Sequence, residues 1–194
     1  MKKLLLILLL TSSLQSWSLA DDVRDFQIGG ISIGDSLLDY YSELEIKESN
    51  PLKYPGSDKF YQIAFFIEDS KYEALSFNLK KNDKRFIIYQ IKGLINYDNK
   101  IEECLREKDN IVKQISSDLK VIKEDNYNSS FNDTLGNSIA YSTDLNITNG
   151  AVGIWCTKWD KDHDKVKSMG WWDSLNVDIS NNEFKNFINN LAYN

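Results

Sequence analysis

The chain is poor in the side chains from which metal centres and nucleophilic active sites are usually built. Its 194 residues include one histidine, two cysteines and two prolines. With His163 as the single histidine, a Ser-His mechanism has one candidate base, and a zinc site of histidines and paired cysteines lacks ligands. The sequence predicts no metal site, no cofactor site and no assigned catalytic residue.

A basic patch is also missing. Lysine and arginine number 23 against 29 acidic residues, which gives a net charge of −6, and Asp83 interrupts the short basic run at 80–85. An acidic protein of this size repels phosphate backbones unless a local patch overrides the net field. We therefore expect no nucleic-acid partner, and we expect the chain to bind an envelope protein or a small ligand instead.

Long apolar runs are absent except at the N-terminus, where residues 1–20 have the three parts of a secretory signal. Lys2 and Lys3 precede the apolar run 4–10, and Ser18-Leu19-Ala20 ends the segment with a small-x-small site. The run is about half the ~20 residues that a bilayer span needs. We predict cleavage between Ala20 and Asp21, a single domain over 21–194 without a membrane span, and, from the composition rich in Asn, Ile and Lys, a bacterial periplasm.

The hydrophobic pattern predicts a mixed fold. Short helices are expected at about 36–41 and 43–48, and a longer one from 101 to about 119, capped by Asp98 or Asn99. Alternation with period two predicts strands at 60–67, 75–79, 87–97, 139–147, 151–159 and 175–179, while the polar segment 121–137 is expected to be a mobile loop. Ser180 is expected to cap a last helix. We predict an α+β fold, an antiparallel meander sheet in two similar halves, ααβββ and αβββα, with the helices packed on one face.

The two cysteines are expected to form a disulfide. A two-residue turn at Asn149-Gly150 would place Thr143 opposite Cys156 and aim Cys156 at the apolar face of its hairpin. Cys104 lies in the apolar stripe of the helix that must cover that face. Two independent periodicities therefore bring Cys104 and Cys156 into one layer, and a pair of buried free thiols is the alternative.

One motif matches an enzyme signature. Residues 34–37 read GDSL, the nucleophile block of the SGNH, or GDSL, esterases, which makes Ser36 a candidate nucleophile, with His163 as base and Asp160 as its orienting carboxylate. That family requires a parallel sheet, whereas consecutive strands with tight turns predict an antiparallel one. The alternative interpretation is that Ser36 caps a helix. We favour a non-enzymatic binding domain and keep the esterase and a structural envelope component as alternatives.

Two further groups of residues admit a functional and a structural interpretation. Asp160, Asp162 and Asp164 alternate as at the start of a calcium loop, but the glycine and glutamate that such a loop requires are replaced. Trp155 and Trp159 alternate with Cys156 and should face away from the core layer, where they form either a binding surface or a second packed layer.

Three stretches together carry a family resemblance. The segment 25–46 (DFQIGGISIGDSLLDYYSELEI), the helix entry Ile101-Glu102-Glu103-Cys104 and the second cysteine followed by Trp159-Asp160 resemble small uncharacterised exported proteins of Pelagibacter-type marine bacteria. The likeness runs through most of the chain. It implies a signal peptide, a paired-cysteine domain, a GDSL that belongs to a helix start, and no known activity.

Overall fold

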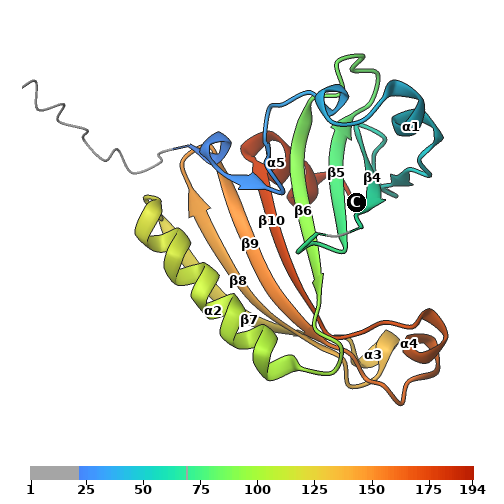
Figure 1. Cartoon of the computed structure of the whole chain (residues 1–194), viewed down its shortest axis with the longest axis vertical. Helices are drawn as coiled ribbons and strands as arrows, with labels where there is room; N and C mark the ends of the chain where they lie inside the picture. The colour runs from blue at the N-terminus through green and yellow to red at the C-terminus, as the bar shows by residue number, and fades with distance from the viewer. Residues whose placement is uncertain (1–21, 69) are drawn as a thin grey trace, which may run out of the picture.

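The computed structural model describes residues 22–68 and 70–194 and shows an α+β fold (Figure 1). The predicted signal peptide and its cleavage site between Ala20 and Asp21 lie outside the described residues. The main sheet has eight strands in the order β3-β4-β5-β6-β10-β9-β8-β7, and every neighbouring pair is antiparallel. In the described part of the chain, no helix combines the length and the apolar sequence that crossing a bilayer requires.

Two four-stranded meanders joined edge to edge make up this sheet. The first contains β3 (Leu52–Lys53), β4 (Phe60–Phe66), β5 (Ala74–Lys80) and β6 (Ile88–Asn96). The second contains β7 (Lys123–Ser130), β8 (Ile139–Ile147), β9 (Gly150–Lys158) and β10 (Ser174–Asn181). β6 and β10, the last strand of each meander, pair with each other. Each meander has one strand more than the sequence predicted.

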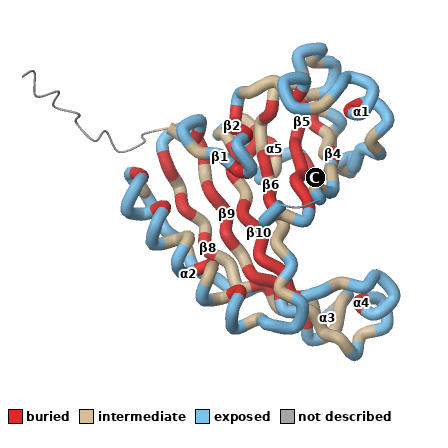
Figure 2. The backbone as a smooth tube through the Cα atoms, in the orientation of Figure 1, coloured by how far each residue is buried: buried red, intermediate tan, exposed pale blue. Residues whose placement is uncertain are grey.

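The apolar core lies on one face of the sheet, because the apolar residues of the central strands occupy alternate positions and are buried. Figure 2 shows that buried residues gather in these central strands. The helices α1 (Glu43–Glu48) and α2 (Ile101–Asp118) contribute Ile46, Cys104 and Ile115 to this core. Two short 3-10 helices, η1 (Val23–Asp25) and η2 (Leu37–Asp39), and the small hairpin of β1 (Gln27–Ile28) and β2 (Ile31–Ser32) complete the layer.

The prediction that all helices pack on one face is wrong for α5 (Asn182–Asn190). This helix covers part of the opposite face, where Phe184 and Phe187 pack on Phe60 of β4, with ring centroids 5.3 and 4.9 Å away. Phe60 and Tyr89 form an apolar patch on an otherwise polar face, and α5 buries that patch. The remaining helices, α3 (Asn132–Leu135) and α4 (Asp164–Met169), lie beyond one end of the sheet (Figure 1).

Cys104 of α2 and Cys156 of β9 form a disulfide across the core layer, with their Cα atoms 6.0 Å apart. The predicted register of the β8–β9 hairpin is nevertheless wrong by two residues, because Cys156 faces Tyr141 and not Thr143. The turn is Thr148-Asn149, and Asn149 supplies the positive φ of 64°. Gly150 belongs to β9 and packs under Val23, where a Cβ would collide with the Ser180 backbone. A shift by two residues preserves which face each side chain occupies, so both sulfurs still meet.

Three local predictions are also corrected. The segment 121–137 is not a loop, because its polar residues form the edge strand β7 and the short α3. An edge strand has one hydrogen-bonded neighbour and both faces near solvent, so it can form without an apolar pattern. Neither Asp98 nor Asn99 caps α2, which follows Lys100 without a side-chain cap. The cap of α5 is Asn181, whose Oδ1 accepts from the Phe184 N–H, and not Ser180.

Candidate functional site

The face of the sheet opposite the core, here called the polar face, carries a row of charged residues. Strand register places Lys92 (β6), Asp178 (β10), Gly153 (β9), Asp144 (β8) and Asp125 (β7) directly opposite one another. Directly opposed residues of neighbouring antiparallel strands point to the same face. Residues separated by as many as 86 positions in the sequence therefore come together in one line across five strands.

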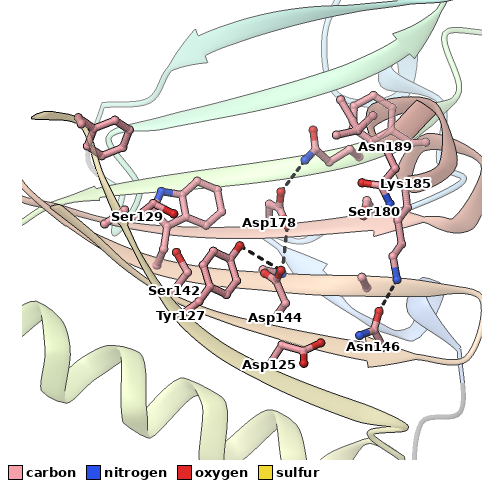
Figure 3. Close-up of a pocket in the computed structure, with 18 residues that line it drawn as sticks. Asp125, Tyr127, Ser129, Ser142, Asp144, Asn146, Asp178, Ser180, Lys185 and Asn189 are labelled. Atoms are coloured by element: carbon pink, nitrogen blue, oxygen red, sulfur yellow. Dashed lines mark hydrogen bonds between the residues drawn. The ribbon is translucent and has the colours of Figure 1, made fainter. Parts of the chain in front are cut away.

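A cavity of about 660 Å³, here called the acidic hollow, lies over this row between the sheet and α5. Its floor consists of the strands β7 to β10, and Lys185 and Asn189 of α5 close one side (Figure 3). Ile188 of the same helix also lines it. Ala140, Ser142, Ala151 and Gly153 lie in the floor, and these small side chains leave the space open. A volume of this size falls within the range of small-molecule sites.

Asp178 lies at the centre of the floor and is held by neutral donors. The backbone N–H of Gly153 donates to Oδ1 at 3.0 Å, and the side-chain amide of Gln90 donates to Oδ2 at 2.6 Å. Burial of the carboxyl group is the largest influence on its acidity and raises the pKa of Asp178 to about 6, against the opposing effect of these two hydrogen bonds. Asp178 is therefore a desolvated acceptor whose pKa lies above that of an ordinary aspartate.

Asp144 lies on the other side of Gly153. The Tyr127 hydroxyl donates to its Oδ2 at 3.1 Å, as Figure 3 shows, and burial raises the pKa of Asp144 above its usual value. Asp125 differs from this pair because Lys123 neutralises it at 2.7 Å on the exposed edge. Burial also lowers the pKa of Lys92, the next residue of the row beyond Asp178. The floor thus holds two half-buried carboxyl groups with different partners.

A second cavity of about 340 Å³, here called the tryptophan hollow, continues along the polar face. Trp155 and Phe131 line both cavities, and Trp159, Trp171 and Trp172 line the second one. Trp159 packs on Trp171 with ring centroids 4.6 Å apart and on Phe131 at 6.0 Å. The expectation that Trp155 and Trp159 face away from the core layer agrees with this arrangement.

The GDSL segment has a local structural role. The Ser36 hydroxyl accepts from the Leu38 N–H at 3.2 Å and donates to the Arg85 carbonyl at 2.6 Å. Asp35 accepts from the Ser32 N–H at 2.9 Å and from the Tyr40 hydroxyl at 2.7 Å. Gly34 has a φ of 92°, which favours glycine, and Leu37 is fully buried. The Ser36 side chain thus caps η2 and fastens it to the β5–β6 connection.

His163 and Asp160 lie near α4. His163 occupies the N-cap position of that helix, and its buried Nδ1 has no hydrogen-bond partner among the described residues. Asp160 accepts from the backbone N–H groups of Asn137 at 2.8 Å and Asp162 at 3.0 Å. Its oxygens therefore stabilise the connections around α3 and α4. Among the described residues, the Asp160 carboxylate forms no hydrogen bond with the His163 ring and no ligand group with Asp162 and Asp164, while the backbone carbonyl of Asp160 accepts from the His163 N–H at 3.1 Å.

The structure does not bring Ser36 and His163 together. Ser36 bridges to Ile87 at the start of β6, while His163 belongs to the loop cluster beyond Asn96 at the end of that strand. At about 3.3 Å per residue the two ends of β6 are roughly 26 Å apart. The antiparallel sheet also differs from the parallel one that the SGNH esterases use. The geometry therefore gives the esterase alternative no support.

Sequence reasoning missed the carboxyl pair. Asp144 and Asp178 occupy the polar alternate positions of strands whose apolar positions were assigned to the core, and a solvated face explains such positions equally well. The sequence carried no signal that separates the two cases, because an antiparallel sheet can expose one whole face to water and the cover over this face, α5, comes from the last helix of the chain. Comparisons with protein-family models, with curated proteins and with solved structures found no match to this chain.

Proposed function

We propose that this chain is an exported, non-enzymatic binding domain that holds a small polar molecule in the acidic hollow. The observation that carries the proposal is the cavity itself, about 660 Å³ over the floor of β7 to β10. Side chains from five strands and one helix converge on it, and they combine fixed acceptors with aromatic surfaces. Convergent polar groups in a concave, partly aromatic site are typical of ligand recognition.

The residues of the floor support binding rather than packing. Gly153, Ala151, Ala140 and Ser142 are small although they lie in the middle strands of a sheet, where larger side chains would fill the space. Both oxygens of Asp178 already accept hydrogen bonds, which favours a fixed acceptor over a proton donor. An envelope protein remains the alternative partner, but a recessed site suits a small molecule better than a protein surface.

Export to a periplasm is part of the proposal. The secretory pattern of residues 1–20 and the Cys104–Cys156 disulfide both fit an oxidising compartment. Membership of the small exported proteins of Pelagibacter-type bacteria is proposed on the three resembling stretches alone. The intact mass of the exported protein tests the first point, since the chain should begin at Asp21, and retention of residues 1–20 would contradict it.

The binding function can be tested by blocking the hollow. Ser142 lies in the floor on β8, and Ser142→Trp places an indole in the cavity. Ser117→Trp on the exposed surface of α2 is the matched control. Native mass spectrometry of each purified chain, mixed with a fractionated small-molecule extract, should show a bound species for the wild type and the control that Ser142→Trp loses. Binding that persists in Ser142→Trp, or no bound species in any fraction, would refute the proposal.

A further inference from the structure

We propose that the acidic hollow is a site for an organic cation, with an ammonium group seated over Gly153 between Asp144 and Asp178 and the attached carbon skeleton lying against Trp155 and Phe131. This inference rests on the proposed binding function and names the chemical class of its ligand.

The absence of a side chain at Gly153 opens the position between the two carboxyl groups. Gly153 is the direct strand partner of Asp144 on one side and of Asp178 on the other. A Cβ atom at position 153 would lie 2.8 Å from Oδ1 of Asp178 and 3.5 Å from Oδ1 of Asp144. The space above the glycine is therefore flanked by both carboxyl groups, and a group with several N–H donors placed there reaches both.

The two carboxyl groups around this position have no cationic hydrogen-bond donor within the described chain. Among the described residues, neither Asp144 nor Asp178 has an ion pair within 4.0 Å, and their hydrogen-bond donors are the neutral groups of Tyr127, Gly153 and Gln90. Lys92, the strand partner of Asp178 on β6, acts on it through its charge but is not among its ion pairs. Lys185, the cation of α5 that lines the hollow, donates to Asn146. Burying a carboxylate without a cation is costly, and a cationic ligand removes that cost. The raised pKa values of both groups have the same cause.

Aromatic rings provide the second part of the site. Tyr127, Phe131 and Trp155 line the hollow, and ring faces attract cations and the polarised C–H groups next to them. Trp155 and Phe131 also line the tryptophan hollow, so a carbon skeleton can extend along the polar face. A bare metal ion fits less well, because the described residues contain no group of three His, Cys, Asp or Glu side chains arranged to hold one. A neutral polyol is the competing ligand class.

Three matched pairs of probes separate charge from shape. The members of each pair differ mainly in the positive charge. The pairs are tryptamine with tryptophol, putrescine with butanediol, and choline with its neutral carbon isostere dimethylbutanol. Calorimetry with the disulfide-bonded chain at low salt and neutral pH should show at least one cation that binds about tenfold more tightly than its neutral partner, the worth of one charge-assisted hydrogen bond. The cation should also displace from the wild type the bound species that Ser142→Trp loses, which would place the cation in the hollow.

The variant Asp144→Asn keeps the size of the side chain and an acceptor for Tyr127 but removes the charge. It should reduce the preference for the cation by about tenfold while the neutral partner binds as before. Asp118→Asn on the exposed end of α2 is the charge-matched control and should keep the preference. A readout without ligand is the melting temperature of the free protein at neutral pH, which Asp144→Asn should raise because an uncompensated carboxylate is removed.

The outcomes decide the two proposals separately. Equal affinity for both members of every pair, no binding of any cation, or a melting temperature that Asp144→Asn lowers would each overturn the organic-cation inference. The binding function would still stand if the extract experiment yields a species that Ser142→Trp loses. If that species is also absent, both proposals fail.

Discussion

Gly153 and Asp178 face each other across β9 and β10, and the backbone N–H of Gly153 donates to the Asp178 carboxyl group at 3.0 Å. The donor is a backbone group of the neighbouring strand, so the bond ties the carboxyl group of β10 to β9. A side chain at position 153 would occupy that place. The glycine thus both holds the acid and leaves room above it.

The stability of the fold should depend on pH through Asp178. Its folded-state pKa of about 6 is above the ordinary value of an aspartate, so the folded chain binds this proton more tightly than the unfolded chain. The contribution of protonated Asp178 to the free energy of unfolding is complete below about pH 4 and is lost as pH rises through about 6. Its total is on the order of 2–3 kcal/mol. Asp144 across Gly153 acts in the same direction, while Lys92 of β6 opposes it.

Denaturant unfolding of the wild type and Asp178→Asn at several pH values tests this expectation. The wild type should lose stability relative to the variant between about pH 4 and 6 and run parallel to it above. Asp118→Asn serves as the surface control. A wild-type curve that rises relative to Asp178→Asn over this interval would show that Asp178 is ionised readily in the folded state.

Gly153→Ala should destabilise the protein by roughly 1–3 kcal/mol, because the added methyl group would lie 2.8 Å from Asp178 Oδ1 and force that carboxyl group to move. The same substitution in an Asp178→Ala background should cost much less. A double-mutant cycle by equilibrium unfolding measures this coupling. Additive costs would mean that the glycine is required for another reason.

Ser36→Ala should lower the free energy of unfolding by about 1 kcal/mol, since it removes a helix cap that also bonds Arg85. Ser168→Ala on the exposed surface of α4 is the control. Urea denaturation measures both variants. The esterase alternative makes the opposite claim, and ester hydrolysis by the purified protein that disappears in both Ser36→Ala and His163→Ala would establish it.

Replacing both cysteines by serine should cost roughly 4 kcal/mol in the chain-entropy model, because the bridge closes a loop with a sequence separation of 52. Reduction of the wild type should give a similar loss. Unfolding with and without a reductant, together with a thiol count on the denatured chain, tests both statements. Two free thiols in the untreated protein would exclude the bond.

The elements that could be predicted from the sequence are those with one apolar face. Ile139, Leu145 and Ile147 mark β8 with its observed bounds, and α1 has the predicted bounds 43–48, with Ser42 as its N-terminal cap. β7 could not be predicted in this way, since its side chains are mostly exposed and only its backbone pairs with β8. Hydrophobic periodicity reports burial, and an exposed edge strand has little of it.

The acidic hollow depends on a different kind of information. Asp144 and Asp178 become neighbours only because β9 lies between β8 and β10 with Gly153 in the exact register. The predicted hairpin register was wrong by two residues, which would have placed other side chains opposite Gly153. An error of two residues leaves each side chain on its predicted face of the sheet, but it changes which residues lie opposite each other.

The seam between β6 and β10 sets an order of events during folding. Each meander closes through hairpins between strands adjacent in sequence, while the seam joins strands about 80 positions apart and must wait for the last strand. Until then β6 presents an unpaired edge of alternating apolar residues, to which the β10 of another copy could add as readily as its own. Conditions that slow the folding of the second meander, such as loss of the disulfide that anchors β9, should therefore increase the exchange of strands between molecules.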